Sequence, residues 1–191
     1  MVDVESSGLN QRTDCLISIG AVALVNGRID PQDAFEVVLK QSRVSDTKNI
    51  LLHGIGAEAQ REGVEPQEAL LSFLEFVGQS PLVAHHADFD QGMINRAMRS
   101  FLGYELRQVW LDLAWILPEL FNDKIDGNAT LDQWLAQFKI PNVLRHNAVA
   151  DAYATAQLLQ VALQRATVFN WNNAMALIEA EKSRRWMRRA R

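Results

Sequence analysis

Two acidic residues alternate with valine at the very start of the chain, in Val2-Asp3-Val4-Glu5, and this pattern constrains the fold more than any other. Successive side chains of a β-strand point to opposite faces, so both carboxylates would lie on one face and both valines on the other. Ser6-Ser7-Gly8 then predicts a turn whose backbone amides can approach a ligand closely. Because neighbouring carboxylates repel each other, we expect a divalent cation with oxygen ligands between them.

Composition limits the possible classes of protein. A chain of 191 residues with 48% hydrophobic and 22% charged residues is typical of one globular domain. We expect no membrane-spanning segment and no signal peptide. The single Cys15 excludes an internal disulfide and a cysteine-based zinc site, and it favours a cytoplasmic location. The net charge is −4, but the last ten residues contain basic side chains and no acid. This basic end either contacts a phosphate backbone or is simply a solvated helix terminus.

The order of the expected elements predicts an α/β fold with a mixed five-stranded sheet flanked by helices. Residues 15–25 read as a strand, Asn26-Gly27 as a hairpin turn and 34–39 as the returning strand, which with the first segment makes an antiparallel meander. Strands and helices then alternate, as in sheets that bind ligands at the carboxyl ends of their strands. Further strands are expected over 81–85 and 108–113, a loop over 121–128, and helices over 47–52, 66–78, 91–101, 114–120, 131–138 (capped by Thr130), 147–166 and 171–191.

Two later segments carry further candidate residues. His85-His86-Ala87-Asp88-Phe89-Asp90 follows an expected strand, and N-capping of the next helix is an alternative role for either aspartate. His146-Asn147-Ala148-Val149-Ala150-Asp151 places a histidine before a helix and a carboxylate in its first turns. Asp151 lies in an otherwise apolar stretch, so it needs a partner, because burying an unpaired carboxylate is costly.

Together the three segments resemble the motifs of the DEDDh branch of the DEDD 3′–5′ exonucleases, in particular the proofreading subunit of bacterial DNA polymerase III and its free-standing homologues. The resemblance runs in register from residue 1 to about residue 164 and makes Asp90, rather than Asp88, the functional acid. Three departures stand out. Only Met1 and Val2 precede Asp3, so the first strand is expected to be clipped; His86 stands where asparagine is frequent; and the final helix from Trp171 onward lies outside the motif-bearing region. Within the first motif, Ser6-Ser7 stands where a pair of threonines is usual.

The resemblance implies a ribonuclease H-like exonuclease domain over residues 1–168, followed by a helical extension with a basic end over 169–191. It also implies metal-dependent hydrolysis of DNA from the 3′ end, releasing nucleoside 5′-monophosphates with two Mg²⁺ or Mn²⁺ ions. Two ions can activate a water and stabilise the leaving oxygen of an anionic phosphodiester. The implied metal ligands are Asp3, Glu5, Asp90 and Asp151, and His146 is the implied general base.

Six further residues are candidates for contact with the terminal nucleotide: Ser6, Gly8, Leu9, His53, His86 and Phe89. A structural role is an equal alternative for His53, and a core position is favoured for Phe89. Single-stranded DNA is the favoured substrate and RNA is possible, with a DNA polymerase subunit as a possible partner. Two rivals stay open: an exoribonuclease or short-oligonucleotide nuclease with the same site, and a catalytically silent nucleic-acid-binding accessory of a polymerase.

Overall fold

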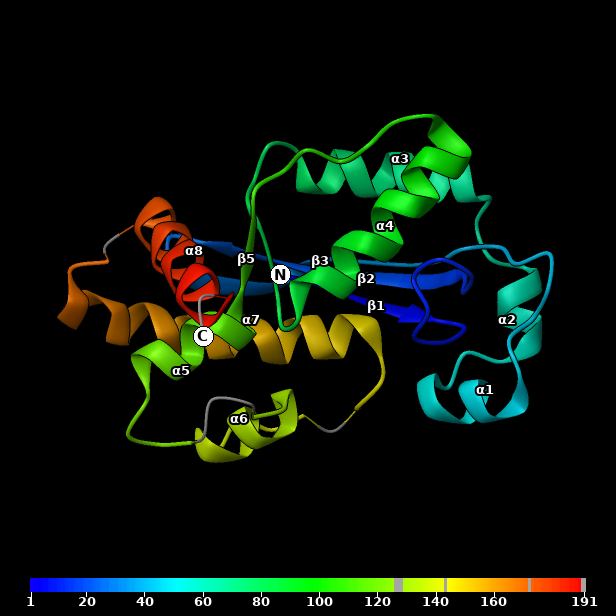
Figure 1. Cartoon of the computed structure of the whole chain (residues 1–191). Coiled ribbons are helices and arrows are strands. Elements are labelled where there is room, and N and C mark those ends of the chain that lie inside the picture. The colour runs from blue at the N-terminus through cyan, green and yellow to red at the C-terminus, as the bar shows by residue number, and fades with distance from the viewer. Residues whose placement is uncertain (126–128, 143, 172, 190–191) are drawn as a thin grey trace.

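The computed structural model describes residues 1–125, 129–142, 144–171 and 173–189 (Figure 1). Its first three strands form an antiparallel sheet in the order β1 (Val2–Ser6), β2 (Leu16–Val25) and β3 (Arg28–Val38). Asn26 and Gly27 both have positive φ, 52° and 75°, as the predicted two-residue hairpin requires. β3 begins directly after this turn and is therefore longer than predicted, because Val25 already pairs with Arg28.

The last two strands, β4 (Leu82–Ala84) and β5 (Trp110–Asp112), pair with each other in parallel. The predicted α/β class is thus confirmed, but the prediction of one five-stranded sheet needs correction, since the strands are hydrogen-bonded as three and two. β4 still lies beside β1. One amide on the free edge of β1, that of Val4, donates to the side chain of Asp90 at 3.1 Å. On this edge of β1 the Val4 amide is therefore bonded to a side chain, whereas the sequence predicts a neighbouring strand there.

Helices cover both faces of the three-stranded sheet. α3 (Pro66–Val77) and α4 (Ala87–Leu102) pack on one face, and α7 (Ala148–Ala166) crosses the other (Figure 1). The valines of β1 belong to the core on the α3/α4 side, together with the buried Phe73 and Ile94. The alternation in β1 thus turns its valines towards one core and its carboxylates towards α7.

Three further helices extend the layer on the α7 side. α5 (Leu113–Leu120), α6 (Leu131–Gln137) and α8 (Ala174–Arg189) surround a second core with α7, centred on fully buried side chains such as Trp134 and Leu117. Two short helices, α1 (Thr47–His53) and α2 (Ala57–Arg61), and a 3₁₀ turn, η1 (Thr167–Phe169), complete the described elements. No helix in the described ranges is both long and apolar enough to cross a membrane.

Caps explain several helix boundaries. Asp46, Thr130 and Asn147 each accept a hydrogen bond from a first-turn amide, and Thr130 forms a complete capping box with Gln133. The sequence missed α2 and placed the start of α4 at residue 91, whereas α4 begins at Ala87. Residues 126–128 of the predicted loop lie outside the described ranges.

The C-terminal helix α8 packs against β5 and α5, and its Leu177 and Ile178 are buried in the second core. The division between residues 1–168 and 169–191 stays a prediction. Three of the basic residues near the end form ion pairs: Lys182 with Glu179, Arg184 with Glu119, and Arg185 with Asp88, Asp112 and Glu181. The side chains of Arg188, Arg189 and Arg191 lie outside the described part of the chain.

Candidate active site

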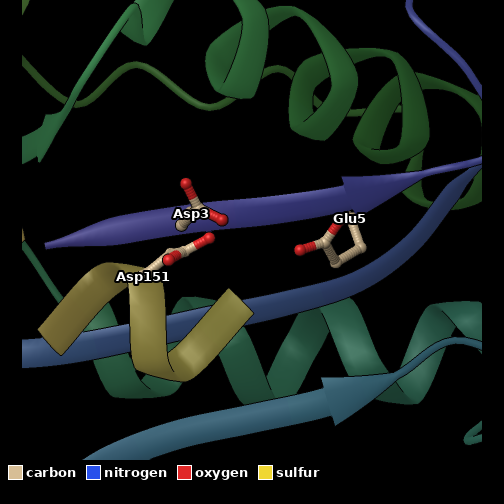
Figure 2. A group of neighbouring side chains, drawn as sticks. All are labelled: Asp3, Glu5 and Asp151. Carbon is tan, nitrogen blue, oxygen red and sulfur yellow. The ribbon is translucent and has the colours of Figure 1, made fainter. Parts of the chain in front are cut away.

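The site begins on β1, where the predicted alternation places Asp3 and Glu5 on the same face. Asp151, in the first turn of α7, completes a cluster in which one oxygen of each carboxylate lies within 4.8 Å of the others. Figure 2 shows the three side chains converging between the strand and the start of the helix. Residues separated by almost the whole chain are thereby brought to one point, as the spacing of the motifs predicts.

Gly20 explains why α7 can approach β1 so closely. It pairs with Asp3 in the β1–β2 ladder. A Cβ atom built on Gly20 would lie 2.2 Å from both the Ala148 carbonyl carbon and the Val149 nitrogen. The first turn of α7 therefore rests directly on the backbone of β2, which sets Asp151 opposite Asp3. Glycine within a strand often marks such a close backbone approach, and this is the signal by which the sequence could have identified Gly20.

Asp90 reaches the site from the free edge of β1. It is 5% exposed, lies in the first turn of α4 and accepts the Val4 amide hydrogen bond. The described carboxylate cluster consists of Asp3, Glu5 and Asp151 and does not include Asp90, although the charge of Asp90 contributes to raising the pKa of Asp3. The alternative role of N-cap does not apply to Asp90, because the cap of α4 is His86.

His146 occupies the last turn before α7. Its φ of 61° is in the left-handed region, and its backbone amide donates to Oδ2 of Asp151 at 3.1 Å. The next residue, Asn147, caps α7 by accepting from the amide of Ala150 at 3.0 Å. The turn therefore holds the backbone of His146 against the carboxylate of Asp151, beside the cluster.

The cluster is short of positive charge. Burial, followed by the charges of Asp90, Asp151 and Glu5, raises the pKa of Asp3 well above its ordinary value. Burial and the charge of Asp151 raise the pKa of Glu5 to about 7. Burial also raises the pKa of Asp90, although the amides of Asp90 and Val4 act in the opposite direction. Carboxylates that resist ionisation in this way favour a cation among them.

Asp151 already has cationic and polar neighbours that the sequence did not suggest. Arg145 Nη1 and Asn142 Nδ2 both contact Oδ1 of Asp151, and the same guanidinium pairs with Asp132. The charge of Arg145 lowers the pKa of Asp3 and of Glu5, against the larger effect of burial. Arg145 is thus the internal counter-cation of the cluster.

The predicted nucleotide-contact residues after β1 form a tight turn. Ser6 Oγ donates to the carbonyl of Gly8 at 2.6 Å. A Cβ on Gly8 would lie 2.5 Å from Oδ2 of Asp14, a group that instead accepts from the amide of Asn10 at 2.8 Å. Leu9 is 87% exposed. The turn therefore presents an apolar side chain and backbone next to the carboxylates.

The other three predicted contact residues have different surroundings. His53 is buried, with Nε2 bonded to Asn49 Oδ1 and Nδ1 accepting from the amide of Ile55. His86 is exposed at the start of α4, and its ring stands edge-on to that of His85. Phe89 is partly buried against the core on the α3/α4 side. Contact with a nucleotide stays a prediction for all three residues.

An α/β fold that gathers three carboxylates between its first strand and a late helix suits a metal-dependent hydrolase, and comparison with known proteins gives the family. The model of the RNase_T exonuclease family matches residues 1–159. The chain belongs to this exonuclease family, and the family membership predicted from the sequence motifs is confirmed.

The relatives include DNA polymerase III proteins. The PolC-type DNA polymerase III of Bacillus subtilis is 31% identical over 162 residues, which is 82% of this chain and 11% of that protein. The DNA polymerase III epsilon subunit of Buchnera aphidicola is 26% identical over 204 residues, covering 100% of this chain and 83% of that subunit. The chain thus spans only about a tenth of the PolC-type relatives but most of the epsilon subunit.

Solved structures share the fold. Exonuclease X, in complex with 5′-overhanging duplex DNA, superposes with a TM-score of 0.71 at 20% identity, covering 94% of this chain and 97% of that one. Exonuclease I of E. coli with a dT13 oligonucleotide gives 0.72 at 15% identity over 93% and 44% of the two chains. S. pombe Pop2p, in a form with bound Mg²⁺ and Mn²⁺, gives 0.69 at 15% identity over 86% and 82%. The ribonuclease H-like fold class is therefore confirmed.

Proposed function

We propose that the protein is a metal-dependent 3′–5′ exonuclease that releases nucleoside 5′-monophosphates from DNA. The observation that carries this proposal is the convergence of Asp3, Glu5 and Asp151 from the first strand and a late helix, with Asp90 at the strand edge. Membership of the exonuclease family and the likeness to an epsilon subunit over nearly its full length support the same activity.

The residues of the site suit divalent ions. All four donors are carboxylates, the hard oxygen ligands that Mg²⁺ and Mn²⁺ prefer, and burial makes their shared negative charge unfavourable without a cation. Asp3, Glu5 and Asp151 would hold one ion, and Asp90 together with Asp3 would help to hold a second. Pop2p, a neighbour in fold, was solved with Mg²⁺ and Mn²⁺. Bound ions supply positive charge for the phosphodiester and lower the pKa of an attacking water.

The protein's own groups orient the reaction around that centre. We assign His146, whose backbone amide donates to Asp151, the role of accepting a proton from the attacking water. The Ser6–Leu9 turn offers Leu9 as an apolar surface for the last base and backbone groups for the sugar. Arg145 contacts Oδ1 of Asp151, so it would compete with an ion for this carboxylate, and Asp132 offers the guanidinium another partner.

DNA is the proposed substrate because the related proteins are DNA polymerases or their subunits, and because Exonuclease I and Exonuclease X were solved with DNA. A polymerase is the proposed partner for the same reason. A cytoplasmic setting is proposed as well, since Cys15 is exposed and unpaired and would stay a thiol in a reducing compartment.

Nucleotide release from 3′-labelled and 5′-labelled single-stranded DNA, with Mn²⁺ or with EDTA, tests the proposal. A ladder shortened one nucleotide at a time from the 3′ end, present with Mn²⁺ and absent with EDTA, is the expected result. Matched RNA in parallel separates an exoribonuclease, which would degrade RNA preferentially. Binding of the 3′ end without release of nucleotide under any metal condition would contradict the proposal and favour the silent accessory.

A further inference from the structure

A buried ionic network joins the C-terminal helix to the segment that carries Asp90. Glu181 in α8 is 7% exposed, and its Oε2 accepts from the backbone amide of Asp112 at 2.9 Å. Arg185, one turn later, donates to Glu181 Oε1 at 2.7 Å, to Asp112 Oδ2 at 3.0 Å and to Asp88 Oδ2 at 2.8 Å. Its guanidinium also lies 5.0 Å from the ring centroid of Trp115. One arginine therefore bridges α8, the end of β5 and the first turn of α4.

Asp112 passes this connection to the turn before α4. Its Oδ1 accepts from the amide of His86 and from the amide of Ala114, both at 2.9 Å. Asp112 is 2% exposed, so each of its carboxylate oxygens is satisfied within the protein. Arg185 supplies the positive charge that this buried carboxylate requires, because a buried charge left without a partner is strongly destabilising.

The turn itself needs external support. His86 has φ 66° and ψ 47°, which lie in the left-handed region that is unfavourable for a non-glycine residue. His86 caps α4 without a side-chain hydrogen bond. The hydrogen bond from its amide to Asp112 holds this conformation, and the direction in which α4 starts places Asp90 against the edge of β1.

We propose that Arg185 and Glu181 are positioning residues, which clamp the turn before α4 and thereby fix Asp90 beside Asp3. The clamp rests on contacts within the protein, and only its consequence for metal binding rests on the proposed function. α8 follows the region matched by the exonuclease family model, which ends at residue 159. This chain therefore uses its C-terminal helix to hold the second motif in place.

Amide hydrogen exchange of the metal-free protein tests the clamp directly. Arg185→Gln should speed exchange across residues 84–90 by about tenfold or more, and Arg185→Lys should give an intermediate rate because it keeps the charge but not the fork of donors. Arg99→Gln is the matched control. Arg99 also forms an ion pair, with Glu105, but the pair is exposed and lies at the last turn of α4, away from residues 84–90. Equal exchange over residues 84–90 in Arg185→Gln and the wild type would overturn the proposal.

A milder variant guards against global unfolding. Asp88 is 72% exposed at its side chain, so Asp88→Asn removes one arm of the clamp without leaving a buried charge unpaired. It should speed exchange over residues 84–90 with an unchanged melting temperature. Faster exchange spread evenly over the chain would show that the contact supports general stability only. That result, or no acceleration of exchange at all, would refute the clamp.

Mn²⁺ binding, measured by calorimetry without substrate, tests the consequence for Asp90. Groups that orient metal ligands typically affect metal affinity by 10–100-fold. Arg185→Gln should therefore weaken the second ion by at least about tenfold and leave the first ion, assigned to Asp3, Glu5 and Asp151, unchanged. Unchanged affinity for both ions would refute the link to Asp90. If the wild type itself bound no Mn²⁺, the proposed function would fail, while the exchange experiment would still decide the clamp.

Discussion

In the proposed site Glu5 would hold a metal ion, and in the metal-free protein its buried carboxylate lowers the stability of the fold, a cost that Glu5→Gln should make measurable. The pKa of this carboxyl rises from 4.5 to about 7 on folding, mainly through burial and the charge of Asp151. The folded protein therefore binds the proton more tightly than the unfolded chain, so the free energy of unfolding falls as the pH rises from 4.5 to 7. At ~1.4 kcal/mol for each pH unit, the wild type loses about 3 kcal/mol across this window.

Glu5→Gln removes this titration. In EDTA the variant should be more stable than the wild type by about 3 kcal/mol at pH 8 but by less than about 1 kcal/mol at pH 5. For a domain of this size the difference at pH 8 corresponds to a rise in melting temperature of about 6–12 °C. Urea denaturation at the two pH values measures it, with Glu75→Gln, an exposed residue of α3, as the control. Equal gains at both pH values, or a loss of stability at pH 8, would refute the reasoning.

Four other substitutions test the remaining parts of the site. Asp3→Ala should abolish Mn²⁺-dependent nucleotide release while circular dichroism reports an intact fold; full activity would remove Asp3 from the centre. His146→Ala should slow single-turnover cleavage by about 10²–10⁴ without weakening Mn²⁺ binding in calorimetry, whereas a normal rate across the pH range would exclude a general base. Gly20→Val should lower both stability and activity, because a side chain there would collide with the backbone of α7, and wild-type melting and rates would show that the approach of α7 is dispensable. Arg145→Gln should raise Mn²⁺ affinity by about tenfold, because it removes a cation that competes for Asp151. This gain, about 1.4 kcal/mol, is smaller than the ~4 kcal/mol of a full ion pair because Asp132 offers the guanidinium another partner. Weaker Mn²⁺ binding would show that Arg145 supports the ion.

The sequence predicts the part of this protein that depends on local pattern. Alternation in β1, the Asn26-Gly27 turn and the capping box at Thr130 each follow from the preferences of a few adjacent residues, and the structure contains all three. The convergence of Asp3, Glu5 and Asp151 is also anticipated, because the fold class brings the ends of these elements together. Within the described residues the five strands form two sheets and not one, and on the edge of β1 that faces β4 the Val4 amide bonds the side chain of Asp90, a contact that no local pattern predicts.

What the sequence could not predict are the residues that act through contact across the fold. Arg145 and Arg185 are both arginines at or near helix ends, and the sequence predicts a solvated role or a phosphate contact only for the basic end that contains Arg185. Their functions differ because of the acids each one meets: Asp151 and Asp132 for Arg145, and Asp112 with Glu181 for Arg185. In the proposed site the first pairing would compete with a bound ion, since the guanidinium contacts Asp151, an assigned ligand. The second would persist, since its acids lie behind the turn that precedes α4. One arginine would thus compete with the ion for a carboxylate, and the other would hold Asp90 in position for it.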